Sequence, residues 1–498
     1  MKKLKISYTA FVFLFVAMSS CSNTPESFTE SDKYPEILPQ YNSVVIPYNI
    51  APLNFRIIEN ADDYRTRIYS KKGNSIICKG KDVRININKW KDLLAANKGS
   101  SVYFDIYLKK DSKWVKLKTI ENVISEDAID NYVVYRYIQP LYTTYEDMSI
   151  NQRNLENFEV KTLIDNMVYS SEKNSHCVNC HSFQDYNKGG NMQIHFRGKN
   201  GGTVLIVDNE HKKVNPKADG LKSGAVYPAW HPELKYIAYS INDIGQNFHT
   251  KKSDKVEVLD SRSDLILYDV EKNEVTKITE TEDYMETFPY WSPDGDFLYY
   301  SSAHFIMESD NHQAETIKKY QNIKYDLIRL PFNKADKSFG KADTIFNASS
   351  MGKSATFPRI SPDGKYMMFT LGDFGNFHIW HKTSDLHLMD LKTREYRNLE
   401  NVNSKDVESY HSWSSNGRWF IFSSRRDDGG YTRLYISYFD KNGNAHKPFI
   451  LPQEDPQFYN KSFKSFNIPE FIVEPVETNR HKLYNASSGE AEKAKLIN

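Results

Sequence analysis

Two cysteines and a histidine at residues 177–181 form the sequence feature with the clearest chemistry. Cys177 and Cys180 are separated by two residues, and His181 follows directly, in the run CVNCH. This spacing attaches a c-type haem, because two thiols on one short segment can each add to a vinyl group of the porphyrin and the next imidazole can bind the iron. We therefore expect covalently bound haem c, with His181 as the proximal iron ligand.

Two other chemistries remain open for the same three residues. They could hold zinc with a distant fourth ligand, although the sequence shows no second ligand pair at the short spacing of structural zinc sites. Outside the cytoplasm, Cys177 and Cys180 could instead form a structural or redox-active disulfide. A disulfide leaves His181 without a role, so haem is the interpretation that uses all three residues.

The sixth iron position has candidates on the strand predicted to follow. His195 alternates with apolar neighbours in MQIHFR, and Met192 comes first in that run, shortly after two glycines. We expect His195 as the distal ligand and Met192 as the other choice; methionine ligation raises the reduction potential of a haem iron. His249 and His378 come next, because both lie in loops predicted to share the face of the haem motif.

The N-terminus carries an export signal. Lys2, Lys3 and Lys5 precede the apolar run of residues 8–18, which is too short to cross a membrane. Small residues then lead to Cys21. This pattern resembles a bacterial lipoprotein signal, with a signal peptide at residues 1–20 and Cys21 as the lipidated first residue of the mature chain. Met18 departs from the usual leucine of that motif.

Lipidation of Cys21 predicts a membrane-anchored protein. Ser22 follows the cysteine, which by the sorting rule for such signals favours the outer membrane, with the protein facing the periplasm or the cell surface. Residues 21–40, rich in Ser, Pro, Glu and Asp, are expected to form a flexible tether. The expected partners are the membrane, other envelope proteins and a redox partner. Cys78, in an apolar run, is interpreted as a buried core thiol.

Composition excludes nucleic acid as a partner. The chain has 498 residues, 65 basic and 64 acidic residues and a formal charge of +1, and the two signs are mixed evenly along it. Its length is sufficient for two or three domains.

The second half of the chain repeats itself. The runs VYPAWHP, FPYWSPDG, FPRISPDG and YHSWSSNG begin at residues 226, 288, 357 and 410, and each is followed by a strand-like apolar run. Asp-Gly and Asn-Gly supply the positive φ angles of tight hairpin turns. Four-stranded units repeated in this way are typical of a β-propeller.

The repeat resembles that of TolB-type propellers over roughly residues 175–456. Five blades can be counted, and the CxxCH motif occupies the first strand of the first one. A sixth blade would have to come from residues 140–175 or 457–498. The predicted parts are a β-sandwich at 41–138, where apolar and polar residues alternate, a helical or irregular linker at 139–175, the propeller at 176–456, and a C-terminal extension or blade closure at 457–498.

As a whole, the chain is similar to exported Bacteroidetes lipoproteins that join a TolB-like propeller to one CxxCH motif. The resemblance implies a membrane-anchored monohaem protein for electron transfer or ligand sensing, and it supplies no substrate. The alternative is a non-haem propeller that binds glycans or proteins in the cell envelope. The sequence has no G-x-S-x-G motif and no α/β domain after the repeats, so a serine peptidase is excluded and other enzyme activity stays open.

Overall fold

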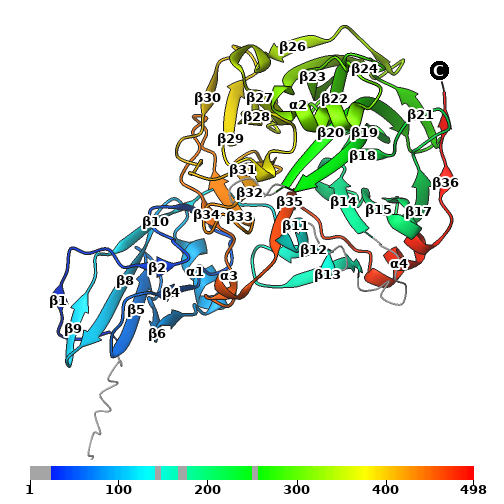
Figure 1. The fold of residues 1–498 in the computed structure, drawn as a ribbon. Coiled ribbons are helices and arrows are strands. Elements are labelled where there is room, and N and C mark those ends of the chain that lie inside the picture. The colour runs from blue at the N-terminus through cyan, green and yellow to red at the C-terminus, as the bar shows by residue number, and fades with distance from the viewer. Residues whose placement is uncertain (1–23, 141–146, 167–176, 249–255, 498) are drawn as a thin grey trace, which may run out of the picture.

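The computed structural model describes residues 24–140, 147–166, 177–248 and 256–497. These residues are mainly β, with 47% in strands and 11% in helices. Figure 1 shows an N-terminal body of strands beside a ring of sheets, which confirms the predicted mainly β, propeller-like fold. The predicted signal peptide, Cys21 and His249 lie outside the described residues. In the described ranges, no helix combines the length and apolar character needed to cross a bilayer.

The N-terminal body contains two sheets and one helix. The larger sheet has the order β1-β9-β8-β10-β3, with β5 on the other edge of β8 and β6 beside β5; the smaller has the order β2-β4-β7. Their bounds are β1 (Thr29–Glu30), β2 (Ile37–Leu38), β3 (Val45–Pro47), β4 (Phe55–Ile57), β5 (Asp63–Tyr69), β6 (Ile76–Lys79), β7 (Asp82–Val83), β8 (Ser101–Lys110), β9 (Lys113–Lys116) and β10 (Ile120–Ser125), and the helix is α1 (Ile87–Ala96).

The two N-terminal sheets share one apolar core. Phe55 of the smaller sheet packs edge-on against Phe104 of the larger one, with ring centroids 6.0 Å apart. Trp90 of α1 is fully buried in the same cluster, and its indole nitrogen donates to the carbonyl of Ile50 at 3.0 Å. Along β5 every second residue is buried, as the predicted alternation requires. Cys78 lies in this core, as expected.

The predicted tether at residues 21–40 is corrected by the structure over its described part. β1 pairs in parallel with β9, and β2 pairs antiparallel with β4. Ile37 is only 1% exposed. A few apolar residues in a polar stretch are enough to add strands to an existing sheet, because the sheet satisfies their backbone hydrogen bonds.

Six sheets of four or five strands make up the ring in the described part of the chain. One is β13-β12-β11-β35, and the other five follow the chain from β14 to β34. The strands of the first sheet are β11 (Tyr132–Ile138), β12 (Ser149–Asn154), β13 (Val160–Asp165) and β35 (Ser465–Ile472). The remaining strands are β14 (Cys177–Phe183), β15 (Met192–Arg197), β16 (Gly202–Val207), β17 (Glu210–Asn215), β18 (Ala225–Trp230), β19 (Tyr236–Phe248), β20 (Val256–Asp269), β21 (Glu274–Lys277), β22 (Tyr284–Trp291), β23 (Phe297–His304), β24 (Asp326–Asn333), β25 (Ser338–Phe339), β26 (Asp343–Phe346), β27 (Ser354–Ile360), β28 (Tyr366–Gly372), β29 (Asp385–Asp390), β30 (Tyr396–Asn398), β31 (Glu408–Trp413), β32 (Trp419–Ser424), β33 (Arg433–Tyr438) and β34 (Phe449–Ile450).

The sheet β13-β12-β11-β35 joins distant parts of the chain and corrects two predicted boundaries. β11 was expected in the N-terminal sandwich but pairs with β12 and β35. The linker predicted at 139–175 contains β12 and β13. β12 escapes sequence patterning because most of its buried residues are polar: Asn151, Gln152 and Arg153 are all at most 5% exposed. Arg153 donates to the carbonyl of Pro452 at 3.0 Å, which offsets the cost of burying it.

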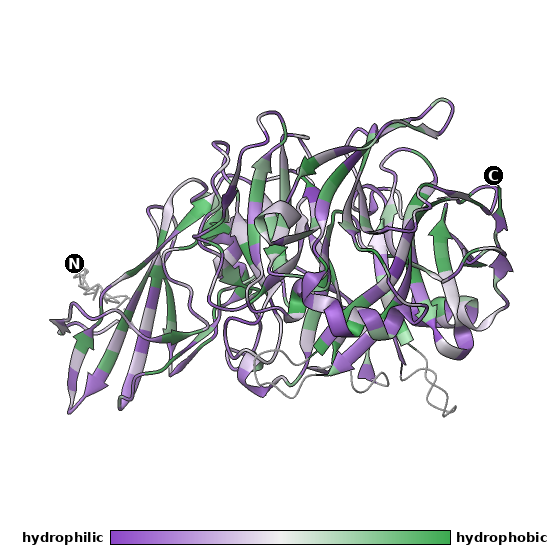
Figure 2. Ribbon diagram, turned by 45° about the horizontal axis from the view of Figure 1, so that its top comes forward, coloured by the Kyte–Doolittle hydropathy of each residue, from purple (hydrophilic) through white to green (hydrophobic). Residues whose placement is uncertain are grey.

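The C-terminal segment completes the ring. After β35, helix α4 (Arg480–Ser488) packs on β13, β16 and β17. The last two strands, β36 (Glu492–Lys493) and β37 (Lys495–Leu496), then pair in parallel with β17 and β21 at the outer edges of two sheets. Two further helices, α2 (His312–Lys319) and α3 (Phe458–Lys461), lie in connections. Figure 2 shows apolar residues on the strands and polar residues on the loops around them.

The innermost strands share a bulge that fills the centre of the ring. In each sheet, the pairing register shifts so that two residues of the innermost strand lie opposite one residue of the second strand. Five residues in these bulges have a left-handed backbone with φ between 50° and 54°: Tyr227, Phe288, Phe357, Tyr410 and Ile468. Their side chains meet on the axis, with the Phe288 and Phe357 rings 4.1 Å apart and the Phe357 and Tyr410 rings 4.8 Å apart. We call these five residues the axial plug.

Candidate functional site

The CxxCH motif lies on β14, the innermost strand of its sheet. In a regular strand, residues three apart point to opposite faces. Here the register shifts between Val178 and His181, so the extra residue returns the second thiol to the side of the first. Both Cys177 and Cys180 consequently line one cavity of about 100 Å³ near the axis, which we call the thiol cavity.

The two thiols are buried and form no disulfide among the described residues. Cys177 and Cys180 are 9% and 7% exposed. The Cys177 thiol contacts the Met148 sulfur at 3.9 Å. Burial raises the pKa of the Cys177 thiol, while Arg197 and Arg136 act in the opposite direction. Cys177 is therefore a protonated thiol at neutral pH, rather than a reactive thiolate.

Two arginines share the thiol cavity. Arg197 is the direct cross-strand partner of Cys177, and Arg136 comes from β11 of the neighbouring sheet. Tyr227 of the axial plug and Phe377 close other parts of the wall. Guanidinium groups recognise carboxylates through paired, charge-assisted hydrogen bonds. The cavity therefore combines two thiols with two groups suited to hold an acidic substituent.

His181 does not face the thiol cavity. Its cross-strand partner is Ile194, which packs with Val178 and Phe196 in the core between two sheets, and paired residues share a face of a sheet. The imidazole is 1% exposed, and burial lowers its pKa to about 3. Backbone groups of Val134 and Ile468 lie near the ring. Even so, neither ring nitrogen reaches a hydrogen-bond partner among the described residues.

These residues fit haem c in their chemistry but not yet in their arrangement. The site offers two thiols that form no disulfide, a neutral imidazole whose buried nitrogens reach no partner among the described residues, and two arginines of the charge that suits propionates. The structure brings together only the thiols and arginines. The thiol cavity is also smaller than the roughly 300–1,000 Å³ of most ligand pockets. The expectation that all three motif residues converge is therefore corrected for the described structure.

None of the described candidates for the sixth iron ligand lines the thiol cavity. Met192 is fully buried in the core between two sheets. His195 lies opposite the bulge, a position that the other sheets fill with the aromatic core residues Tyr135, Tyr239, Tyr300, Phe369 and Phe422.

Two histidines among these candidates have hydrogen-bond partners elsewhere. The Nδ1 atom of His195 lies 3.2 Å from the Thr203 hydroxyl. His378 is fully buried, with Nδ1 3.0 Å from the Thr356 hydroxyl and Nε2 3.2 Å from the Phe374 carbonyl. Burial lowers the pKa of both histidines to about 3, so each is a neutral, structurally engaged imidazole.

The zinc alternative lacks a complete ligand set in the described part of the chain. No group of three or more His, Cys, Asp or Glu side chains is assembled there in a way that could hold a metal ion. Cys177 and Cys180 supply two ligands on one cavity, while His181 points away from it.

A second chamber lies near the axis, lined by the far ends of the inner strands. Its volume is about 330 Å³. The inner-strand residue directly after the bulge contributes to the wall in five sheets: Ala229, Tyr290, Arg359, Ser412 and Glu470. His181 occupies the same position in the sixth. We call this cavity the central chamber.

Sequence reasoning missed Arg359 and Glu470. Both stand at the variable position of the repeat, in FPRI at 357–360 and in IPEF at 468–471. The second run is a degenerate copy of the repeat motif, and recognising it would have identified β35 as an inner strand. The tryptophans of the repeat, Trp230, Trp291 and Trp413, are at most 7% exposed. The Trp291 and Trp413 indoles donate to inner-strand carbonyls of neighbouring sheets at 3.1 Å.

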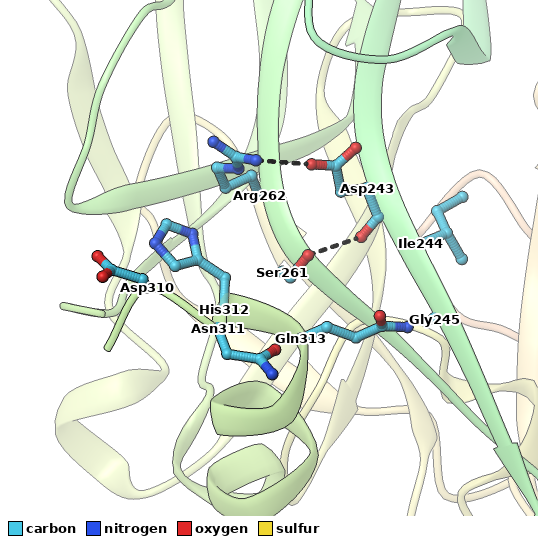
Figure 3. Close-up of a pocket in the computed structure, with 9 residues that line it drawn as sticks. All are labelled: Asp243, Ile244, Gly245, Ser261, Arg262, Asp310, Asn311, His312 and Gln313. Carbon is cyan, nitrogen blue, oxygen red and sulfur yellow. Dashed lines mark hydrogen bonds and ion pairs between the residues drawn. The ribbon is translucent and has the colours of Figure 1, made fainter. Parts of the chain in front are cut away.

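A third, open depression lies between the long β19–β20 hairpin and the start of α2 (Figure 3). Its volume is about 650 Å³. Arg262 and Asp243 form an ion pair at 3.3 Å on one side, and the Ser261 hydroxyl donates to the Asp243 carbonyl at 3.3 Å. Asp310 and His312 lie across from them. These contacts hold the hairpin together.

The chain matches no family model and no curated protein. Among solved structures it is similar to a hypothetical selenium-binding protein from Sulfolobus tokodaii, with 8% identity, 84% of this chain and 95% of that chain covered, and a TM-score of 0.41. It is also similar to an oligogalacturonate lyase from Vibrio parahaemolyticus, with 12% identity, 83% of this chain and 100% of that chain covered, and a TM-score of 0.33. A third similar structure is prolyl oligopeptidase B from Galerina marginata, with 10% identity, 70% of this chain and 42% of that chain covered, and a TM-score of 0.38.

The chain therefore spans less than half the length of the peptidase. Similarities at this level assign no activity to the protein.

Proposed function

We propose that this protein is a c-type haem protein of the cell envelope, built on a β-propeller. The observation that supports the proposal is the presentation of the two CxxCH thiols to one cavity that also holds two arginines. A bulged strand is needed to place residues 177 and 180 on one side, and both thiols share that side here. A structural disulfide would use the same thiols but gives no role to His181, whose ring nitrogens reach no partner among the described residues.

Each residue of the site would make a different contact with the haem. Cys177 and Cys180 would form the thioether bonds, His181 would bind the iron, and Arg136 with Arg197 would pair with the propionates. A bound haem supplies one-electron transfer or binding of a small gaseous ligand. Because His181 now faces the neighbouring sheet, haem attachment requires the chain from 177 to 181 to leave its present pairing.

We also infer a complete architecture from the sheet pairing. Six blades would close the ring, and the blade β35-β11-β12-β13 would be shared between the C-terminal segment and the region before the motif. The two sheets before it would form a sandwich. Cys21 would anchor the protein in the outer membrane as a lipoprotein, with a redox partner or other envelope proteins as its contacts.

The test is covalent haem in protein made with a cytochrome c maturation system. Wild-type protein and Cys78→Ala should keep haem peroxidase stain on a denaturing gel, because Cys78 lies in the N-terminal core. The double variant Cys177→Ala/Cys180→Ala should lose the stain completely. An unstained wild-type band, in cells that mature a control cytochrome, would leave the non-haem scaffold as the function.

A further inference from the structure

The central chamber is built by the fold and is independent of the CxxCH thiols. Cys177 and Cys180 line the thiol cavity, whereas the central chamber is lined by the ends of the inner strands and the turns after them. Tyr410 and Ile468 of the axial plug contribute to both walls and lie between them. The lining of the central chamber extends to Asp185 and Lys188, which are exposed, so this chamber opens to solvent.

Two ionisable side chains, one basic and one acidic, enter the chamber from different sheets. Arg359 projects from β27 and Glu470 from β35, both at the position directly after the bulge. They influence each other electrostatically but form no direct ion pair. Charges held deep in a protein are costly unless they are paired or bind something. A guanidinium and a separate carboxyl on one wall are therefore suited to a ligand that carries both signs.

The Arg359 side chain is held in place by the protein while much of its hydrogen-bonding capacity stays unused. Its guanidinium lies over the Tyr290 ring, 4.7 Å from the centroid, and Nη1 donates to the Pro358 carbonyl at 2.9 Å. A guanidinium has five N–H donors in a rigid fork. The stacking fixes the plane of the fork, and a ligand carboxylate can accept from donors that the protein does not use.

The Glu470 carboxyl is suited to bind a cationic group of a ligand. Burial raises the pKa of its carboxyl to about 8, and Arg359 opposes this shift. With no cation beside it, the carboxyl is thus largely protonated at neutral pH. A ligand ammonium placed beside it would favour the ionised form and gain a charge-assisted hydrogen bond.

Much of the remaining wall is apolar or aromatic, and Ser182, Ser292, Ser412 and His411 add polar groups to it. Trp230, Trp291, Trp413, Ile360 and Phe471 line it together with prolines of the repeat. The volume of about 330 Å³ is at the low end for ligand pockets. We propose that the central chamber binds a small zwitterion with an apolar side chain, a free α-amino acid or a dipeptide, with its carboxylate on Arg359 and its ammonium on Glu470.

The test is isothermal titration calorimetry on the detergent-solubilised full chain. The probes are L-leucine, L-phenylalanine and Leu-Leu, with leucinamide and 4-methylpentanoate as analogues that lack the carboxylate or the ammonium. At least one zwitterion should bind, and its two analogues should bind about tenfold or more weakly, as expected for the loss of one charge-assisted hydrogen bond. Absence of binding by all three zwitterions at millimolar concentration would overturn the proposal.

Matched variants separate this site from a general effect on folding. Arg359→Gln and Glu470→Gln should each weaken zwitterion binding about tenfold or more. Arg329→Gln should leave it unchanged, because Arg329 forms an ion pair with Asp343 away from the chamber. Each variant should keep the cooperative thermal unfolding of the wild type. Weakening by Arg359→Gln alone would identify a plain carboxylate ligand and contradict the zwitterion. The double variant Cys177→Ala/Cys180→Ala should bind the zwitterion as the wild type does. That result would show that binding in the central chamber does not depend on haem.

Discussion

Cys177 and His181 lie on the same strand but point to different sides of their sheet. Cys177 pairs with Arg197, and both line the thiol cavity, whereas His181 pairs with Ile194 of the core between two sheets. The imidazole is buried there with both nitrogens unpartnered. A buried polar group without a partner destabilises the fold by about 1–3 kcal/mol, so His181 occupies its position at the expense of stability.

That cost predicts opposite effects of His181→Leu on stability and on the cofactor. In haem-free protein the variant should be more stable by about 1 kcal/mol or more, because an apolar side chain replaces an unsatisfied one. In matured protein it should keep the covalent stain but lose the spectrum of histidine-ligated iron. Chemical denaturation and visible spectroscopy measure the two effects. A destabilised haem-free variant would show that the imidazole has a structural role.

The shared sheet predicts that the C-terminal segment is essential for folding. A chain ending at residue 464 lacks β35, the strand that pairs with β11 along its whole length, and should be insoluble or unfold without cooperativity. A chain ending at residue 490 loses only β36 and β37, each two residues long at a sheet edge. It should unfold cooperatively with a melting temperature within about 5 °C of the wild type. Equal behaviour of the two truncations would contradict the pairing.

Buried carboxyls predict that stability falls as the pH rises. Burial raises the pKa of Glu286 from 4.5 to about 8, although the Thr281 hydroxyl donates to it at 3.0 Å. A folded-state pKa above the unfolded one means that the native state binds the proton more tightly. Its contribution is therefore complete below about pH 4.5 and is lost as the pH rises through about 8.

Glu286→Gln removes that titration. Relative to wild type, the variant should gain stability on going from pH 5 to pH 9, by about 1 kcal/mol or more. Urea unfolding at both pH values measures the difference. Glu280→Gln is the matched control, because Glu280 is exposed and forms a surface ion pair with Lys277. A parallel pH dependence of wild type and Glu286→Gln would show that this carboxyl is ionised in the native state.

Membrane attachment through Cys21 predicts a simple fractionation result. The wild type should sediment with membranes, because several acyl chains each contribute about 0.8 kcal/mol per buried methylene. Cys21→Ala should be found in the soluble fraction if it is exported, while Cys78→Ala should behave as wild type. Wild-type protein in the soluble fraction, with its N-terminus elsewhere than Cys21, would refute lipid anchoring.

The sequence by itself determined the strand-rich fold and the repeated unit. Tight turns need positive φ angles, and the glycines that follow Asp294, Asp363 and Asn416 adopt φ values of 72°, 70° and 64°. The spacing of the repeated motif then fixes which strands are innermost. These features are local: neighbouring residues decide them, so they can be predicted from the printed chain.

Only the tertiary structure decided how distant segments combine. β35 pairs with β11 across more than three hundred residues, and the buried residues of β12, on the other side of β11, are mostly too polar for hydropathy to reveal. The direction of each side chain in the motif depends on one register shift, which sends the thiols to a cavity and His181 to the opposite face. The central chamber has the same origin. Arg359 and Glu470 line the same chamber because ring closure brings equivalent positions of separate sheets to one axis. Their spacing along the chain does not predict this arrangement.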